Sequence, residues 1–334
     1  MAEITQSMDL IRPMAIANHP LTNKDYTIPT PAIDAMVSMA MRCIEQRIPG
    51  AILEGINRSG KTTGIGYTVQ TLKKEVPDAA VYRFSCTRDL TDNPSDFFSH
   101  LLYSFNHPDP FSGKSRQKRV RLTEMLRKNA GKGRRGLVVL FADEAQRLSY
   151  NMYSWLADIY NELDAKRVTV ITFLVGQPDL ANQKVALIKA NKMEIVGRFM
   201  VQHLRFNGLT SASDVATCLN AYDESCCPEE SGWSYTRFFF PKAYLCGLRA
   251  VNSATTLWNV FQKHHEVAGS PGELEIPMQY FAGAVEHIFR NYSGEDNADF
   301  GVSERMWAGA VEETGFKEQE ENLRLRMTMS VQDV

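Results

Sequence analysis

The chain has 334 residues, of which 44% are hydrophobic and 23% are charged, and this composition is typical of a soluble globular protein. This length and the net charge of −2 favour one large domain with a smaller second one. No apolar stretch approaches the roughly 18 residues of a membrane-spanning helix, and the first twenty residues, with Glu3 and Asp9, lack a secretory-signal pattern. We therefore expect a cytoplasmic protein with no membrane segment.

The first 48 residues are predicted to form an extension that leads into a core domain. They contain prolines at 13, 20, 29 and 31 and a helical run from Ala32 to Gln46, which Pro49-Gly50 ends. The apolar strand Ala51–Glu54 then runs directly into Gly55–Thr62, which matches G-x-x-x-x-G-K-[ST].

This motif predicts a loop that binds the phosphates of a nucleotide. Its glycines let backbone N–H groups face phosphate oxygens, and the next helix begins with the positive end of its dipole toward the same anion. We expect Lys61 to reach the β and γ phosphates of ATP and Thr62 to bind Mg²⁺. A glycine-rich turn without a ligand is the alternative. The predicted nucleotide contacts in the loop are Gly55, Asn57, Arg58, Ser59, Gly60, Lys61, Thr62 and Thr63.

A basic segment follows the helix Lys61–Glu75, the strand Ala79–Cys86 and the helix Pro94–Phe105. Between Lys114 and Arg135 there are ten bases and one acid, a net charge of +9, so the remainder carries −11. This asymmetry indicates contact with a polyanion through one face, although a charge run can also be a solvated helix face.

The next strand, Leu137–Ala142, ends in two carboxylates. It is a continuous apolar run of the kind buried in a parallel sheet. We expect Asp143 to hold Mg²⁺ and Glu144 to polarise the water that attacks the γ phosphate. The alternative is a strand that simply ends in polar residues.

Two further polar residues are predicted to contact nucleotide. After the helix Tyr150–Asp164, the strand Val168–Val175 runs into Gly176-Gln177, and Gln177 is a candidate sensor of the γ phosphate, or part of an ordinary turn. Arg198 lies between a helix predicted over 178–193 and a last strand over Phe199–Phe206. It is a candidate arginine finger for a neighbouring subunit, or it forms a surface ion pair.

From Gly208 onward only helices are predicted, over about 210–224, 238–250, 253–266 and 277–290, and Arg249 among them is a candidate second sensor. The fold class is thus α/β: a doubly wound, parallel, five-stranded sheet with a small all-helical lid. From Asn291 the chain is polar and rich in acids. The expected domains are an extension (1–48), a core (49–207), a lid (208–290) and a tail (291–334).

The six cysteines, at 43, 86, 218, 226, 227 and 246, form no C-x-x-C pair. A metal cluster of Cys218, Cys226, Cys227, Cys246 and His203 would match no common zinc spacing, so reduced thiols are favoured.

The order of these parts resembles the AAA+ ATPases. The resemblance rests on Gly55–Thr62, on Asp143-Glu144-Ala145-Gln146, on the polar strand tip at Gln177, on Arg198 and on the helical lid, and it covers about residues 30–290. Within that class, the compact size, Asp-Glu-Ala-Gln and Gly-Gln-Pro-Asp-Leu are similar to the transposition regulators, the TnsC, TniB and MuB-like proteins, and most of all to TnsC of transposons guided by a CRISPR complex.

The resemblance implies an ATP-hydrolysing homo-oligomer, a ring or filament assembled on double-stranded DNA, which links a target-selection complex to the transposase. In that family, elements between the second and third core strands grip DNA, and the basic segment lies in this interval. Few aromatics accompany the bases, which favours duplex over single strands. The implied DNA contacts are Lys114, Arg116, Lys118, Arg119, Arg121, Arg127 and Lys128.

Three other functions share the nucleotide loop, and one of them is that of a non-catalytic scaffold that binds nucleotide without hydrolysing it. A helicase loader or replication-initiator ATPase would have the same core and different partners. A small-molecule kinase would have the same loop, but it has no need of a carboxylate such as Glu144 to activate water.

Overall fold

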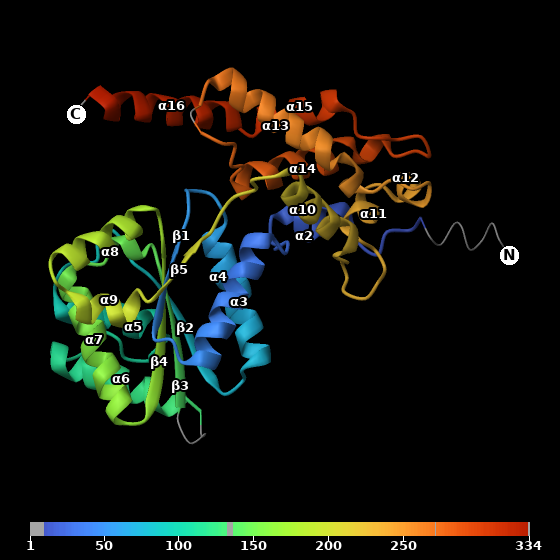
Figure 1. The fold of residues 1–334 in the computed structure, drawn as a ribbon. Helices are drawn as coiled ribbons and strands as arrows, with labels where there is room; N and C mark the ends of the chain where they lie inside the picture. The colour runs from blue at the N-terminus through green and yellow to red at the C-terminus, as the bar shows by residue number, and fades with distance from the viewer. Residues whose placement is uncertain (1–9, 132–135, 271, 333–334) are drawn as a thin grey trace. The chain divides into compact units, whose positions relative to one another are not determined.

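The chain folds into two compact units, shown in the computed structural model of Figure 1. The structure describes residues 10–131, 136–270 and 272–332, with side chains up to residue 325. We call Ala32–Phe206 the α/β unit, and Met1–Pro31 with Asn207–Val334 the helical unit.

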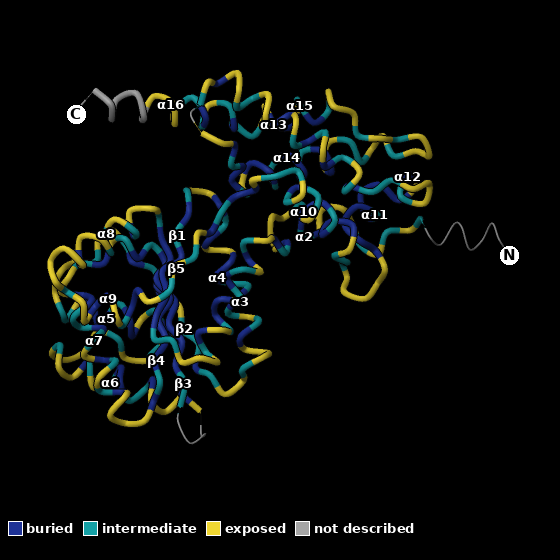
Figure 2. The backbone as a smooth tube through the Cα atoms, in the orientation of Figure 1, coloured by how far each residue is buried: buried dark blue, intermediate teal, exposed yellow. Residues whose placement is uncertain are grey.

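The α/β unit is built on a parallel five-stranded sheet with the strand order β2-β3-β4-β1-β5. The three central strands are almost wholly buried, as the dark tube in Figure 2 shows. This burial explains why their sequences are continuous apolar runs. The strands are β1 (Gly50–Glu54), β2 (Ala79–Ser85), β3 (Gly136–Asp143), β4 (Val168–Gly176) and β5 (Gln202–Arg205).

Helices cover both faces of this sheet, so the predicted doubly wound architecture is confirmed (Figure 1). Alternate residues of β3 supply the two cores: Val139 and Phe141 pack with α3 and α4, whereas Val138 and Leu140 pack with α5 to α9. The helices are α3 (Pro31–Gln46), α4 (Lys61–Glu75), α5 (Pro94–Ser104), α6 (Ser115–Asn129), η2 (Ala145–Arg147), α7 (Tyr150–Ala165), α8 (Asp179–Lys189) and α9 (Met193–Phe199).

The strand register brings the predicted site residues to one edge of the sheet. Asp143 at the end of β3 pairs with Val175 of β4, and Gly176 pairs with Glu54, the last residue of β1. Because all strands are parallel, the loop after β1, the carboxylates after β3 and the amide after β4 leave the sheet at the same edge.

The end of the α/β unit differs from the prediction. The helix expected over 178–193 is two helices, α8 and α9, and Asn191 between them has a left-handed φ of 55°. Phe199, expected in the last strand, ends α9, so β5 is shorter than predicted and Arg198 lies within a helix.

The helical unit has an aromatic core of its own, which includes Tyr222, Phe238, Phe281 and Trp307. Residues 10–30 belong to this unit, whereas the helix of the expected N-terminal extension belongs to the α/β unit. The elements are η1 (Ile16–Asn18), α2 (Pro20–Asn23), α10 (Ala212–Glu224), α11 (Tyr235–Phe239), α12 (Pro241–Leu245), η3 (Ala250–Ser253), α13 (Ala254–Ala268), α14 (Met278–Tyr292), η4 (Ser293–Glu295), α15 (Glu304–Glu313) and α16 (Phe316–Gln332).

Two expectations for this unit were wrong. The helix over 238–250 is broken into α11, α12 and η3, because Pro241 cannot continue α11 and Gly247 adopts a φ of 101°. The segment after Asn291, expected to be a polar tail, forms α15 and α16, which bury Trp307 and Phe316.

Within the described ranges, no helix combines the length and the apolar character that a membrane span requires. The six cysteines are free thiols. Among the described residues, no three His, Cys, Asp or Glu side chains are grouped as metal ligands.

Candidate nucleotide-binding site

The loop between β1 and α4 has the geometry that its sequence predicts. The N–H of Gly55 donates to the carbonyl of Gly176 over 3.1 Å. A Cβ at Gly55 would lie 2.2 Å from the carbonyl oxygen of Phe206, so no larger residue fits there. Gly60 has a φ of 96°, and α4 begins at the next residue. The loop therefore meets the positive end of the α4 dipole, which favours an anion.

Lys61 is held inside this loop. Its side chain is buried, and its ammonium donates to the carbonyl oxygens of Gly55 at 2.9 Å and Ile56 at 2.6 Å. Carbonyl dipoles compensate a buried cation only in part, so a phosphate group would be a stronger partner. This supports the predicted contact of Lys61 with phosphate.

Thr62 and Asp143 converge from α4 and β3. The hydroxyl of Thr62 donates to Oδ2 of Asp143 over 2.9 Å, and Asp143 is buried. A hydroxyl and a carboxylate are the hard oxygen donors that Mg²⁺ prefers, and this cation usually takes one or two carboxylates and completes its shell with water and phosphate. The two side chains fit the predicted Mg²⁺ site.

Arg83 of β2 is a neighbour of this site that the sequence did not indicate. Its guanidinium forms an ion pair with the same Oδ2 of Asp143 at 2.9 Å. Oδ2 of Asp143 therefore accepts from two donors, one of which is a fixed positive charge. The signal was a charged residue inside the apolar strand Val81–Phe84, but only the β2–β3 pairing brings it to Asp143.

Glu144 has a left-handed φ of 56° and lies in a polar cluster with the two residues of η2 that follow Ala145. Its Oε2 accepts from Nε2 of Gln146 at 2.9 Å and pairs with Arg147 at 3.2 Å. Oε1 of Gln146 in turn accepts the N–H of Gln177 at 3.2 Å. The structure thus joins the predicted base to the predicted sensor through Gln146, to which the sequence analysis gave no role.

Cys86 lies directly behind these carboxylates, with its N–H donating to the carbonyl of Asp143. Burial is the main cause that raises the pKa of its thiol to about 12. The thiol is thus neutral near pH 7 and is not a candidate nucleophile.

Arg198 lies at the opposite edge of the sheet from the nucleotide loop. A Cβ on Gly50, the first residue of β1, would lie 2.5 Å from the carbonyl of Arg198. Since the loop follows the other end of β1, about 16 Å of strand separates the two positions. The guanidinium lies over the ring of Tyr160 and donates to Asn161. Arg198 is therefore badly placed for its own nucleotide.

Arg249, the second sensor candidate, belongs to the helical unit. Its guanidinium donates to the carbonyls of Tyr244 and Leu248 and lies 3.7 Å from the centroid of the Tyr244 ring. These contacts are all local to the helical unit.

The structure divides the predicted DNA contacts into two groups. Lys118 is buried and bonds to Ser95, and three arginines pair with acids: Arg119 with Asp158 and Glu162, Arg121 with Asp109, and Arg127 with Glu124. In contrast, Lys114, Arg116 and Lys128 are exposed and form no ion pair within the described ranges. Residues 132–135, which hold the last three bases of the segment, lie outside the described residues.

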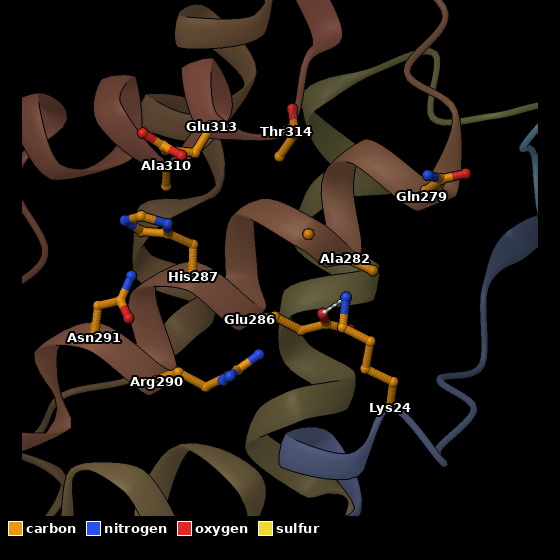
Figure 3. A pocket seen from close by; sticks show the side chains of 11 residues that line it. Lys24, Gln279, Ala282, Glu286, His287, Arg290, Asn291, Ala310, Glu313 and Thr314 are labelled. Atoms are coloured by element: carbon orange, nitrogen blue, oxygen red, sulfur yellow. Dashed lines mark ion pairs between the residues drawn. The ribbon is translucent and has the colours of Figure 1, made fainter.

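The helical unit contains a pocket that no motif indicated. It has a volume of about 670 Å³ and lies between α14 and α15, beside Lys24 (Figure 3). Lys24 pairs with Glu286 at 3.5 Å, and Glu286 also accepts from Tyr26 at 2.9 Å. His287, Arg290 and Glu313 also line it, so both signs of charge are present. None of the predicted site residues lines this pocket.

Comparisons with known proteins agree with this geometry. Residues 50–183 match the family described as an AAA domain, a range that runs from β1 into α8. The solved structures that resemble the chain include ORC2 of Aeropyrum pernix in ADPNP-ADP complexes. This match has 11% sequence identity and a TM-score of 0.59, and it covers 89% of this chain and 71% of that chain. Its ADP form matches with 14% identity, 89% and 73% coverage, and a TM-score of 0.55.

A comparison with curated proteins found no match. The family match and the two structural matches agree on the fold that the sheet order and the loop indicate. The chain has the AAA+ P-loop fold, and its residues 50–183 match the AAA domain family.

Proposed function

We propose that the protein is an ATPase whose nucleotide state controls its assembly on double-stranded DNA. The observation that carries this proposal is the convergence of Lys61, Thr62, Asp143, Glu144 and Gln177 at one sheet edge. These side chains supply a phosphate contact, an Mg²⁺ site, a base for water and a γ-phosphate contact. The ADPNP-ADP and ADP complexes of Aeropyrum pernix ORC2 add support for an adenine nucleotide.

Bound Mg²⁺ would neutralise the charge that develops on the phosphates during hydrolysis. The chain's own residues do the rest. Thr62 and Asp143 hold the cation's position, Lys61 orients the phosphates, and Glu144 accepts a proton from the attacking water. Glu144 also argues against the kinase alternative, because transfer to a substrate hydroxyl needs no water.

Assembly is inferred from Arg198. Since it lies at the edge of the sheet opposite its own loop, it can contact a nucleotide only if that nucleotide belongs to another copy of the chain. We therefore place the candidate arginine finger at an interface between subunits in a ring or filament.

Mixing two inactive variants tests this interface. Arg198→Ala keeps an intact loop, and Lys61→Ala keeps the arginine, so mixed assemblies should recover hydrolysis above that of either variant alone. Light scattering must first establish that the two variants co-assemble. If mixed assemblies form and no activity returns, Arg198 does not act across an interface.

Duplex DNA is the proposed partner, and the exposed bases of α6 and its N-cap are the proposed contacts. We expect Lys114→Ala/Arg116→Ala to weaken duplex binding and to reduce the slope of log affinity against log salt by about 2, because each lost phosphate contact removes about one unit. Lys73→Ala/Lys74→Ala in α4 removes the same charge elsewhere and is the matched control. Equal effects in the two variants would refute a specific role of α6.

Two biological roles fit such a protein. The fold similarity to ORC2 favours an initiator-type or helicase-loading ATPase. The Asp143–Gln146 and Gly176–Leu180 motifs favour a transposition regulator whose partners are a transposase and a target-selection complex.

The roles differ in what they require of the DNA. An initiator must select its own site, whereas a regulator can leave site selection to its partner complex. Selection from a pool of random duplexes, in the presence of a non-hydrolysable ATP analogue, should enrich a sequence motif if the initiator role is correct. Duplex binding without enrichment of a sequence motif would favour the transposition regulator. A protein that binds no duplex would refute both roles.

A further inference from the structure

The side-chain amide of Gln146 bridges the tips of two strands. It donates from Nε2 to Oε2 of Glu144 over 2.9 Å, and it accepts at Oε1 from the backbone N–H of Gln177 over 3.2 Å. A carboxylate accepts and a backbone N–H donates, so only one orientation of the amide satisfies both partners. The contact is thus directional at each end.

The backbone on both sides is shaped to allow this bridge. A Cβ at Gly176 would lie 2.2 Å from Oε1 of Gln146, so only glycine lets the amide approach β4. Glu144 adopts a left-handed φ of 56°, a conformation that costs about 1 kcal/mol for a residue with a Cβ. The left-handed turn and the glycine without Cβ thus lie at the two ends of the same bridge.

The bridge extends as far as the nucleotide loop. Gly55 donates its N–H to the carbonyl of Gly176, and the next residue, Gln177, donates to Gln146. One hydrogen-bonded series therefore runs from the loop through the tip of β4 to the carboxylate of Glu144. Because Oε2 of Glu144 is engaged by Gln146 and Arg147, Oε1 is the oxygen left for a water, and it has no partner among the residues that the structure describes.

We infer that Gln146 is a positioning residue that couples the water-activating carboxylate of Glu144 to the γ-phosphate contact at Gln177. The inference rests on the proposed function. When Gln177 contacts the γ phosphate, the Gln146 amide holds the carboxylate of Glu144 at a fixed distance from that phosphate. The base is therefore correctly positioned only when a triphosphate is bound. Without the amide, the carboxylate of Glu144 would keep only its ion pair with Arg147 among the residues that the structure describes, and these two side chains are 29% and 32% exposed.

Two variants of similar size test the bridge. Gln146→Met removes the donor and the acceptor, and Gln146→Glu keeps an acceptor for Gln177 but places a carboxylate against Glu144. We expect both to lower kcat by about 10- to 100-fold, the cost of a small misplacement of a catalytic group. The Kd for ADP should stay within about twofold. If kcat does not change, or the Kd for ADP rises as much as kcat falls, the inference is wrong.

A double-mutant cycle separates positioning from a merely structural role. In a Glu144→Gln background, Gln146→Met should have little further effect on kcat, because the carboxylate that it positions is gone. If Gln146→Met lowers kcat by the same factor in both backgrounds, Gln146 acts independently of Glu144 and the inference fails. Thermal unfolding of each variant establishes that the comparison is made on folded protein.

A binding measurement distinguishes failure of this inference from failure of the proposed function. The ratio of the Kd for ADP to that for ADPNP reports the γ-phosphate contact without hydrolysis, and we expect Gln146→Met to reduce it several-fold. A wild-type protein that binds ADPNP but never hydrolyses ATP would refute the ATPase proposal alone. An unchanged ratio would refute the coupling through Gln146.

Discussion

The two units of the molecule use polar side chains in opposite ways. In the α/β unit, polar side chains gather at one sheet edge, where Asp143 and Glu144 bond to residues from neighbouring elements and can also bind a ligand. In the helical unit, polar groups lie between packed helices: Asp223 accepts the N–H groups of Ala250 and Val251 at 2.9 and 3.0 Å.

The difference separates groups that serve chemistry from groups that serve folding. A ligand site tolerates substitution of its polar side chains because the apolar strands beneath them are unaffected. A polar group inside a helical core has no water to replace a lost partner, so its removal costs stability.

The largest effect is expected for Glu144→Gln. The substitution keeps the volume and one acceptor oxygen but removes the base, so steady-state ATP hydrolysis should fall at least about 100-fold. The midpoint of urea unfolding should barely change, because Glu144 is partly exposed. An unaffected rate would refute the assignment of Glu144, and a large loss of stability would break the contrast between the units.

A large loss of stability is expected for Asp223→Ala in the helical unit. Two hydrogen bonds to a buried carboxylate disappear, which should lower the free energy of unfolding by about 4 kcal/mol. Tryptophan fluorescence is a suitable probe, because three of the four tryptophans, Trp233, Trp258 and Trp307, belong to this unit. Asp223→Asn keeps one acceptor oxygen and should lose clearly less. Equal losses would show that the charge matters more than the hydrogen bonds.

The helical unit should also lose stability in acid through His19. This imidazole is wholly buried among Tyr235, Phe238 and Phe239, and its Nδ1 accepts the N–H of Leu21. Burial lowers its pKa from 6.5 to about 4. Between these values the unfolded chain binds a proton that the folded chain does not, so the stabilising contribution is complete above pH 6.5 and decreases as the pH falls to 4.

The full effect of this pKa difference is about 3 kcal/mol, reached near pH 4. The measurement is urea unfolding of wild type and His19→Leu at pH 7, 5.5 and 4, followed by tryptophan fluorescence. As the pH falls, the free energy of unfolding of His19→Leu should rise relative to that of the wild type. Parallel curves would mean that His19 is not the group that titrates.

The sequence predicted those parts of the fold that depend on local patterns. Leu137–Ala142 was predicted as a strand because a buried parallel strand is a continuous apolar run, and Gly55–Thr62 was predicted as a loop because few other functions need that spacing. Arg83 and Gln146 could not be placed, because their roles depend on which strands are neighbours. In the same way, the acids after Asn291 indicated a polar tail, and the sequence did not reveal that one of them, Glu320 in α16, is buried and bonded to His265.

The smallest effect is expected for a substitution of Arg119. It tests whether this side chain serves ligand binding or folding. Arg119 was predicted to contact DNA, yet its guanidinium pairs with Asp158 at 2.9 Å and with Glu162 at 3.0 Å on α7. The three side chains are about one third to one half exposed, and ion pairs of this kind contribute about 1 kcal/mol or less. Arg119→Ala should therefore lower the free energy of unfolding by no more than this, and by less in high salt.

The same variant should leave duplex affinity nearly unchanged, because a charge already neutralised by two carboxylates releases few counterions from DNA. Fluorescence anisotropy with a labelled duplex at two salt concentrations measures this, with Lys114→Ala/Arg116→Ala as the variant in which affinity should fall. If Arg119→Ala weakens duplex binding as strongly as Lys114→Ala/Arg116→Ala does, the guanidinium of Arg119 must leave the acids of α7 when DNA binds. The paired arginines of α6 would then be DNA contacts together with the exposed bases.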